Sequence, residues 1–176
     1  MAIRRKCFIS YHHADQEWVD TFIRTFDARH DLFIARQLGS MPEDVINSMD
    51  TDYVMGRIRA DYIKDSTVTI LIAGKCTWAR RYADWEVQAS LRSGSTVIPN
   101  GLLGLKLPTF TQWPDRFDRN LLHPGKIDCY GRWLTWENCT LDALSSAIEA
   151  AFQRRTTHDR YIVNPRERMG YNRACD

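Results

Sequence analysis

The feature that most constrains the fold is a continuous run of β-branched and other apolar residues, Thr67–Ala73, near the middle of the chain. The run lies between Asp65–Ser66 and Gly74, residue types that are typical of loops. A strand with one solvent-exposed face alternates apolar and polar residues, whereas an unbroken apolar run is typical of a parallel strand buried on both faces. We therefore predict a central parallel sheet covered by helices.

Strand and helix patterns alternate on both sides of this run. Strands are predicted at Lys6–Tyr11, Asp31–Ala35, Thr96–Pro99 and Ile127–Tyr130, and helices at Asp15–Phe26, Asp52–Ile63, Tyr82–Leu91 and Leu141–Arg155. Asp15 is expected to cap the first helix. Beyond Asn100 the periodicity fades into a stretch that contains Gly, Leu and Pro. This alternation predicts an α/β fold, in which ligands bind at the carboxyl ends of the strands.

The length of 176 residues predicts a single domain over residues 1–176. We expect its core at about residues 6–155, followed by an arginine-rich tail at 156–176. The segment Arg36–Thr51 contains Gly39, Pro42 and several polar residues, which predicts a long irregular loop. Loops of this length are usually functional or mobile.

Charge and composition exclude some classes of function. The net charge is +2 with both signs interspersed, which argues against a nucleic-acid or membrane partner. No segment resembles a signal peptide or a membrane span, so a cytoplasmic location is expected. The cysteines are five in number, lie far apart and form no CxxC pair, so we expect reduced thiols: Cys7, Cys76, Cys129, Cys139 and Cys175.

Three segments coincide with the carboxyl ends of predicted strands, where an α/β site is expected. They are the Ser10–His12 loop, the Gly39 loop and the stretch Lys75–Glu86. In the third segment Trp78, Tyr82 and Trp85 bring aromatic rings close to the carboxylate of Glu86, and Tyr82 precedes Glu86 by one helical turn. Rings beside an acid can hold a flat cationic ring such as the nicotinamide of oxidised NAD. The carboxylate could stabilise the oxocarbenium-like cation that forms as the glycosidic bond breaks.

Simpler interpretations of these residues remain open. An acidic residue near a helix start more commonly serves the helix dipole, and aromatic residues more commonly pack. His12 and His13 have no partner at metal-ligand spacing, so no metal is assigned. The pair Arg80–Arg81 could meet NAD phosphates, although such arginines are usually solvated surface.

Several motifs together resemble the TIR-like domain of the bacterial Thoeris antiphage system. They comprise Cys7–His12 followed by Asp15, Asp52 with Arg57–Ile58, Asp65–Gly74, and Arg81–Val87. The resemblance spans roughly residues 6 to 107, with a weaker similarity at 161–164 and 170–172. It implies a TIR/flavodoxin-like three-layer fold with a central, mostly parallel sheet and helices on both faces.

The resemblance also implies roles for individual residues. Glu86 would be the catalytic glutamate, and Ser10, Tyr11 and His12 would line the NAD pocket. Tyr82 would occupy an aromatic position that is commonly tryptophan in the family, and Asp52 would face the same cleft. The loop Arg36–Thr51 resembles the mobile segment that covers the site.

The function implied by the resemblance is cleavage of NAD, a substrate rather than a cofactor, into a cyclic ADP-ribose isomer or an ADP-ribose conjugate. This product would activate a separate effector protein, and a phage-derived trigger or self-assembly would switch the enzyme on. An interaction module without turnover is the alternative. A flavodoxin-like nucleotide binder or a deoxyribosyl transferase is a third candidate, since related folds host many chemistries.

Overall fold

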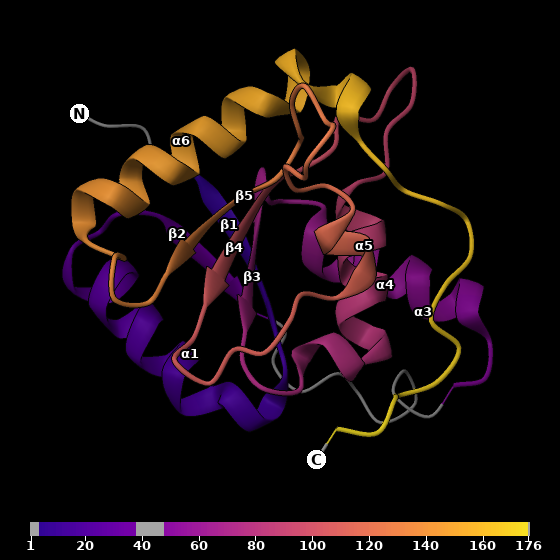
Figure 1. Ribbon diagram of the computed structural model, residues 1–176, viewed down its shortest axis with the longest axis horizontal. Helices are drawn as coiled ribbons and strands as arrows, with labels where there is room; N and C mark the ends of the chain where they lie inside the picture. The colour runs from indigo at the N-terminus through magenta and orange to yellow at the C-terminus, as the bar shows by residue number, and fades with distance from the viewer. Residues whose placement is uncertain (1–3, 38–47, 176) are drawn as a thin grey trace.

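The computed structural model describes residues 4–37 and 48–175. At its centre lies a five-stranded sheet in the order β2-β1-β3-β4-β5, in which every neighbouring pair is parallel (Figure 1). The strands are β1 (Lys6–Tyr11), β2 (Ile34–Gln37), β3 (Val68–Ala73), β4 (Gly101–Lys106) and β5 (Arg132–Thr135). Because β3 is central and buried at every residue, the prediction of a buried parallel strand is confirmed.

Helices cover both faces of the sheet (Figure 1). They are α1 (Gln16–Ile23) with its π-helical continuation Arg24–Arg29, α3 (Thr51–Arg57) with its π-helical continuation Ile58–Ile63, α4 (Arg81–Ser90), α5 (Asp115–Asp118) and α6 (Leu141–Thr157). The predicted helices therefore form, with boundaries shifted by a few residues. Residues 38–47 of the predicted loop Arg36–Thr51 lie outside the described residues. Among the described helices, none is both long and apolar enough to cross a bilayer.

The period-two geometry of the strands divides the core into two parts. On one face Ile70 belongs to a buried cluster with Phe22 of α1 and Ile148 of α6. On the other face Leu71 packs with Val87 of α4 and Phe117 of α5. Successive residues of a strand point to opposite faces, so one apolar strand supplies both halves of the core. The result is the predicted three-layer α/β architecture.

The prediction of a strand at Thr96–Pro99 was wrong. This stretch forms a tight turn closed by a bridge between Gly94 and Val97, and the strand begins only at Gly101. The sequence of β4 contains two glycines, and glycine in a sequence more commonly indicates a turn or loop than a strand. For Gly101 the structure shows the reason: a Cβ at this position would lie 2.2 Å from the carbonyl oxygen of Ala151 in α6.

The prediction of a last strand at Ile127–Tyr130 was also wrong, because the strand is β5 at Arg132–Thr135. Ile127 is 97% exposed. Tyr130 is fully buried and its hydroxyl donates a hydrogen bond of 2.7 Å to the carbonyl oxygen of Asn100. The strand itself lies at the sheet edge and is partly exposed, so its sequence lacks the apolar run that identified β3.

Candidate active site

Helix α4 places Glu86 inside the protein. Eight of its ten residues are buried, because Val87 packs toward α5 while Trp85 and Ala89 pack toward α3. A helix enclosed on so many sides carries even its polar residues into the interior. Glu86 is only 5% exposed, and the hydroxyl of Ser10 in β1 donates a hydrogen bond to its Oε2 atom. The structure thus brings these two predicted residues into direct contact.

The environment of Glu86 favours its neutral form. Burial raises the pKa of the carboxyl from 4.5 to about 8, and the hydrogen bond from Ser10 opposes this effect only in part. Desolvation destabilises a buried carboxylate that has no cationic partner. A perturbed carboxyl of this kind, set between a helix and the sheet, is a common property of functional sites.

Tyr11 and His12 follow Ser10 at the carboxyl end of β1. The hydroxyl of Tyr11 donates a hydrogen bond of 2.7 Å to Oε1 of Gln16, which orients the ring. His12 is 8% exposed, and its ring meets that of His13 edge to face, with 4.2 Å between the centroids. Burial lowers the pKa of His12 to about 4, and His13 and Arg80 act in the same direction. His12 is therefore a neutral imidazole at physiological pH.

Trp85 and Tyr82 occupy different environments. Trp85 is 3% exposed, packs in the cluster around Phe8, and donates its indole N–H to the carbonyl oxygen of Met169 at 2.9 Å. Trp85 also lines a cavity of about 310 Å³ together with Arg81 and Met169, and its contact with the substrate stays a prediction. Tyr82 is half-buried, meets Trp85 at a ring distance of 5.3 Å, and lies under the guanidinium of Arg81 at 5.0 Å.

Within the part of the chain that the structure describes, no hydrogen bond joins the side chains of Asp52 and Glu86. The Asp52 side chain is 93% exposed and pairs with Arg168 at 3.4 Å. The role of capping α3 belongs to Asp50, which accepts hydrogen bonds from the amides of Asp52 and Tyr53. The structure pairs Asp52 with Arg168 near the end of the chain, and the expectation that Asp52 faces the cleft of Glu86 stays a prediction.

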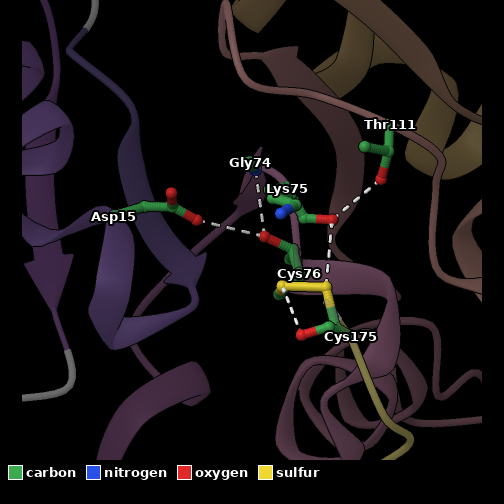
Figure 2. Close-up of a disulfide and its surroundings, with 7 residues drawn as sticks. Asp15, Gly74, Lys75, Cys76, Thr111 and Cys175 are labelled. Carbon is green, nitrogen blue, oxygen red and sulfur yellow. Dashed lines mark hydrogen bonds between the residues drawn. A yellow bond between two sulfur atoms is a disulfide. The ribbon is translucent and has the colours of Figure 1, made fainter.

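A second buried acid, Asp15, lies at the carboxyl end of β3. Thr77 donates a hydrogen bond of 3.3 Å to Oδ2 of Asp15 and accepts one of 3.0 Å from the amide of Gly74 (Figure 2). A Cβ on Gly74 would lie 2.2 Å from Oδ1 of Asp15, so any larger residue there would displace this carboxylate. Asp15 makes no side-chain hydrogen bond to the start of α1, so the predicted capping role was wrong. Its contacts with residues far along the chain leave no local sequence signal.

The same loop is tied to the end of the chain. Cys76 forms a disulfide with Cys175, with 5.6 Å between the Cα atoms (Figure 2). The expectation that all cysteines are reduced was therefore wrong for this pair, whereas Cys7, Cys129 and Cys139 are free. The two partners are 99 residues apart and belong to no spacing motif, which is why the sequence did not indicate the bond.

The tail, residues 158–175, runs beside α4 and α3 as the yellow segment of Figure 1. Arg116 of α5 joins the tail to α4. Its guanidinium pairs with Asp84 of α4 at 2.8 Å. The same group donates hydrogen bonds to the side chain of Asn164 and to the carbonyl oxygens of Pro165 and Glu167 in the tail. Arg116 is 4% exposed. No sequence pattern points to Arg116, because an isolated arginine belongs to no motif or period.

Comparison with known proteins identifies the family. Residues 8–105 match the family model described as "Thoeris protein ThsB, TIR-like domain". The matched stretch runs from β1 into β4, includes both Ser10 and Glu86, and makes up more than half of the 176 residues. A search of curated proteins finds no match. The chain therefore belongs to the family of Thoeris ThsB TIR-like domains.

Proposed function

We propose that this protein cleaves the bond between nicotinamide and ribose in NAD and that Glu86 carries the reaction. The observation that supports this proposal is the buried Glu86 carboxyl held by Ser10 beside the parallel sheet of a TIR-like domain. We further propose that the ADP-ribose-derived product activates a separate effector in antiphage defence, after a phage-derived trigger or self-assembly of this chain.

The chemistry requires little proton transfer. When the glycosidic bond breaks, its electron pair stays on the nicotinamide nitrogen, so the cationic ring leaves as a neutral molecule and the ribose C1′ becomes an oxocarbenium ion. The ionised Glu86 stabilises this cation. Water then yields ADP-ribose and a proton, or a nucleophilic atom of the same molecule closes a cyclic product. The positive charge of bound NAD favours the carboxylate, which offsets the effect of burial on the pKa.

The neighbouring residues take supporting roles in this proposal. Ser10 holds the carboxylate of Glu86 in place, and the neutral His12 lines the pocket without opposing the substrate's charge. Tyr82, one helical turn before Glu86, flanks the nicotinamide. Trp85 lines the substrate pocket beside Tyr82, and its hydrogen bond to Met169 fixes α4 against the tail.

The first experiment compares NAD consumption by wild type, Glu86→Gln and Glu137→Gln, an exposed glutamate elsewhere, by chromatography and mass spectrometry. Each is incubated with NAD at high protein concentration and in lysate of phage-infected cells. We expect nicotinamide and an ADP-ribose-derived product from wild type and Glu137→Gln, and a loss of at least about 10³-fold with Glu86→Gln. If NAD stays intact in every condition while Glu86→Gln protects cells like wild type, the protein is an interaction module instead.

A second experiment uses the pH profile. Since the carboxylate is the active form, kcat/KM should rise with pH around the pKa of about 8 that burial gives Glu86. Ser10→Ala removes the hydrogen bond that lowers this pKa, so the midpoint should move to higher pH. An unchanged midpoint in Ser10→Ala would show that Ser10 does not position the reacting carboxyl.

A further inference from the structure

A cationic pocket lies where the end of α4, the helical continuation Ile58–Ile63 and the tail meet. Its volume is about 650 Å³, and its lining includes four arginines, which are Arg59, Arg92, Arg166 and Arg168. A single acidic side chain, Asp159, belongs to the same lining. Four guanidinium groups around one cavity create a positive potential that attracts anions.

Arg59 lacks an acceptor within this pocket. Its Nε atom is buried and has no hydrogen-bond partner in the part of the chain that is described. Burial lowers the pKa of Arg59, the charges of Arg92 and Arg168 act in the same direction, and the charge of Asp52 opposes them only in part. Arg168, in contrast, already donates to Gln88 Oε1 at 2.6 Å and to Asp52 at 3.4 Å. An anion in the pocket would offset the repulsion between these guanidinium groups. The missing partner of Nε shows in addition that the described residues supply no acceptor to this atom.

The walls of the pocket are held in place by hydrogen bonds. The side-chain amide of Gln88 donates to the carbonyl oxygens of Pro165 and Arg166 at 3.1 and 3.3 Å. The side chain of Asn164 in turn donates to the carbonyl oxygen of Gln88 at 3.1 Å. The tail is thereby fastened to α4 at the pocket, so a ligand would not have to order this wall on binding.

The pocket is separate from the site of Glu86. Glu86 is directed at Ser10 of β1, on the side of α4 that faces the sheet. Gln88 follows two residues later, which on a helix is a turn of about 200° to the opposite side, and it faces the tail. A molecule bound among these arginines therefore lies behind α4 and does not touch the reacting carboxyl.

We propose that this pocket binds a small molecule bearing a diphosphate or longer polyphosphate group. The planar guanidinium fork matches phosphate oxygens in pairs, and several arginines suit a ligand with more than one phosphate. The cavity is larger than one phosphate requires and lies in the size range of small-molecule sites. Ser93 and Asn164 in the lining supply polar groups for hydroxyls of such a ligand.

Calorimetric titration with inorganic pyrophosphate and with ADP tests this inference. We expect wild type to bind both probes, with affinity that falls as salt is raised. Tighter binding of ADP would indicate a nucleotide, and equal binding a polyphosphate alone. Arg59→Gln/Arg92→Gln should weaken binding at least about tenfold. The matched control Arg29→Gln/Arg132→Gln removes two exposed arginines elsewhere and should bind like wild type.

Two further measurements keep the result interpretable. Thermal unfolding checks that each variant is folded, and the single Arg92→Gln variant, at an exposed position, replaces the double variant if that one is unstable. Glu86→Gln should retain binding, so this inference stands or fails independently of NAD cleavage. Absence of binding to wild type, or equal affinity in the arginine variants and the control, would overturn the proposal.

Discussion

At the scale of single residues, the role we propose for Glu86 conflicts with the stability of the fold. Its carboxyl is enclosed by α4 and β1, and one hydroxyl, that of Ser10, is the hydrogen-bond donor that the structure gives it. Of the two effects on its pKa, burial is the larger. Packing alone does not favour a carboxyl at this core position, since an amide or an apolar group would fit there at lower cost.

This conflict predicts a pH-dependent stability difference between wild type and Glu86→Gln. The folded-state pKa of about 8 exceeds the unfolded value of 4.5, so the folded state holds the proton more tightly. The free energy of unfolding of wild type should therefore fall between these two pH values and then level off. Glutamine does not titrate, so the variant should be more stable above about pH 8 by on the order of 3–5 kcal/mol.

Urea unfolding of both proteins at about pH 5, 7 and 9 measures this difference, and taking the difference cancels the other titrating groups. Glu137→Gln, at an exposed position, should behave like wild type throughout. A gap between wild type and Glu86→Gln that stays constant with pH would contradict the buried, protonated carboxyl.

At the scale of secondary structure, the sequence predicted those elements whose residues follow a simple period. β1, β3 and α4 were found because burial imposes runs or helical spacing on them. β4 and β5 were misplaced, since a strand that packs against helices through glycine, and an exposed edge strand, both lose the apolar pattern.

The candidate site was predictable to the same degree. The contact of Ser10 with Glu86 follows from two motifs at the sheet and α4. The contacts of Asp15, Trp85 and Asp52 depend on residues distant in sequence, and no local period encodes such pairings. Sequence patterns therefore identified the elements that hold Ser10 and Glu86, but not the segments that close around them.

The close approach of α6 to β4 makes Gly101 sensitive to substitution. Gly101→Ala would place a methyl group 2.2 Å from the backbone oxygen of Ala151, so helix or strand must move. We expect a loss of about 2–3 kcal/mol in the free energy of unfolding, measured with urea. Gly56→Ala in α3 meets nothing within 4 Å and is the matched control. It should be neutral or stabilising by up to about 1 kcal/mol, and an equal loss in both variants would refute the steric argument.

At the scale of the whole molecule, the tail packs along α4 on the side that faces away from the sheet. The contacts that hold it include those of Arg116 and Gln88 with its carbonyl oxygens, the hydrogen bond of Trp85 to Met169, and the disulfide at Cys175. These contacts join the end of the chain to the helix that carries Glu86. The tail therefore belongs to the folded unit in structural terms, although the sequence favoured an arginine-rich extension beyond the core.

Arg116→Ala tests this description. It leaves Asp84 buried without its cation and frees the tail carbonyls, so we expect the free energy of unfolding to fall by about 3–5 kcal/mol. Tryptic cleavage in the tail, at Arg166 or Arg168, should become faster than in wild type. Arg119→Ala removes an exposed arginine of the same region and should change neither measurement. Slow cleavage in Arg116→Ala would mean that the other contacts hold the tail by themselves.

The way in which the tail is held has a consequence for amide hydrogen exchange. Side chains of α4 and α5 bind mainly the carbonyl oxygens of the tail, as at Pro165 and Glu167, whereas protection from exchange depends on the N–H groups. Within residues 163–175 three amides do donate: Val163 to Asn120, Met169 to Asp84 and Arg173 to Ala79. Slow exchange in this part of the tail should therefore concentrate at these amides, and its other amides should exchange almost like those of an unfolded peptide while the carbonyls keep the segment in place.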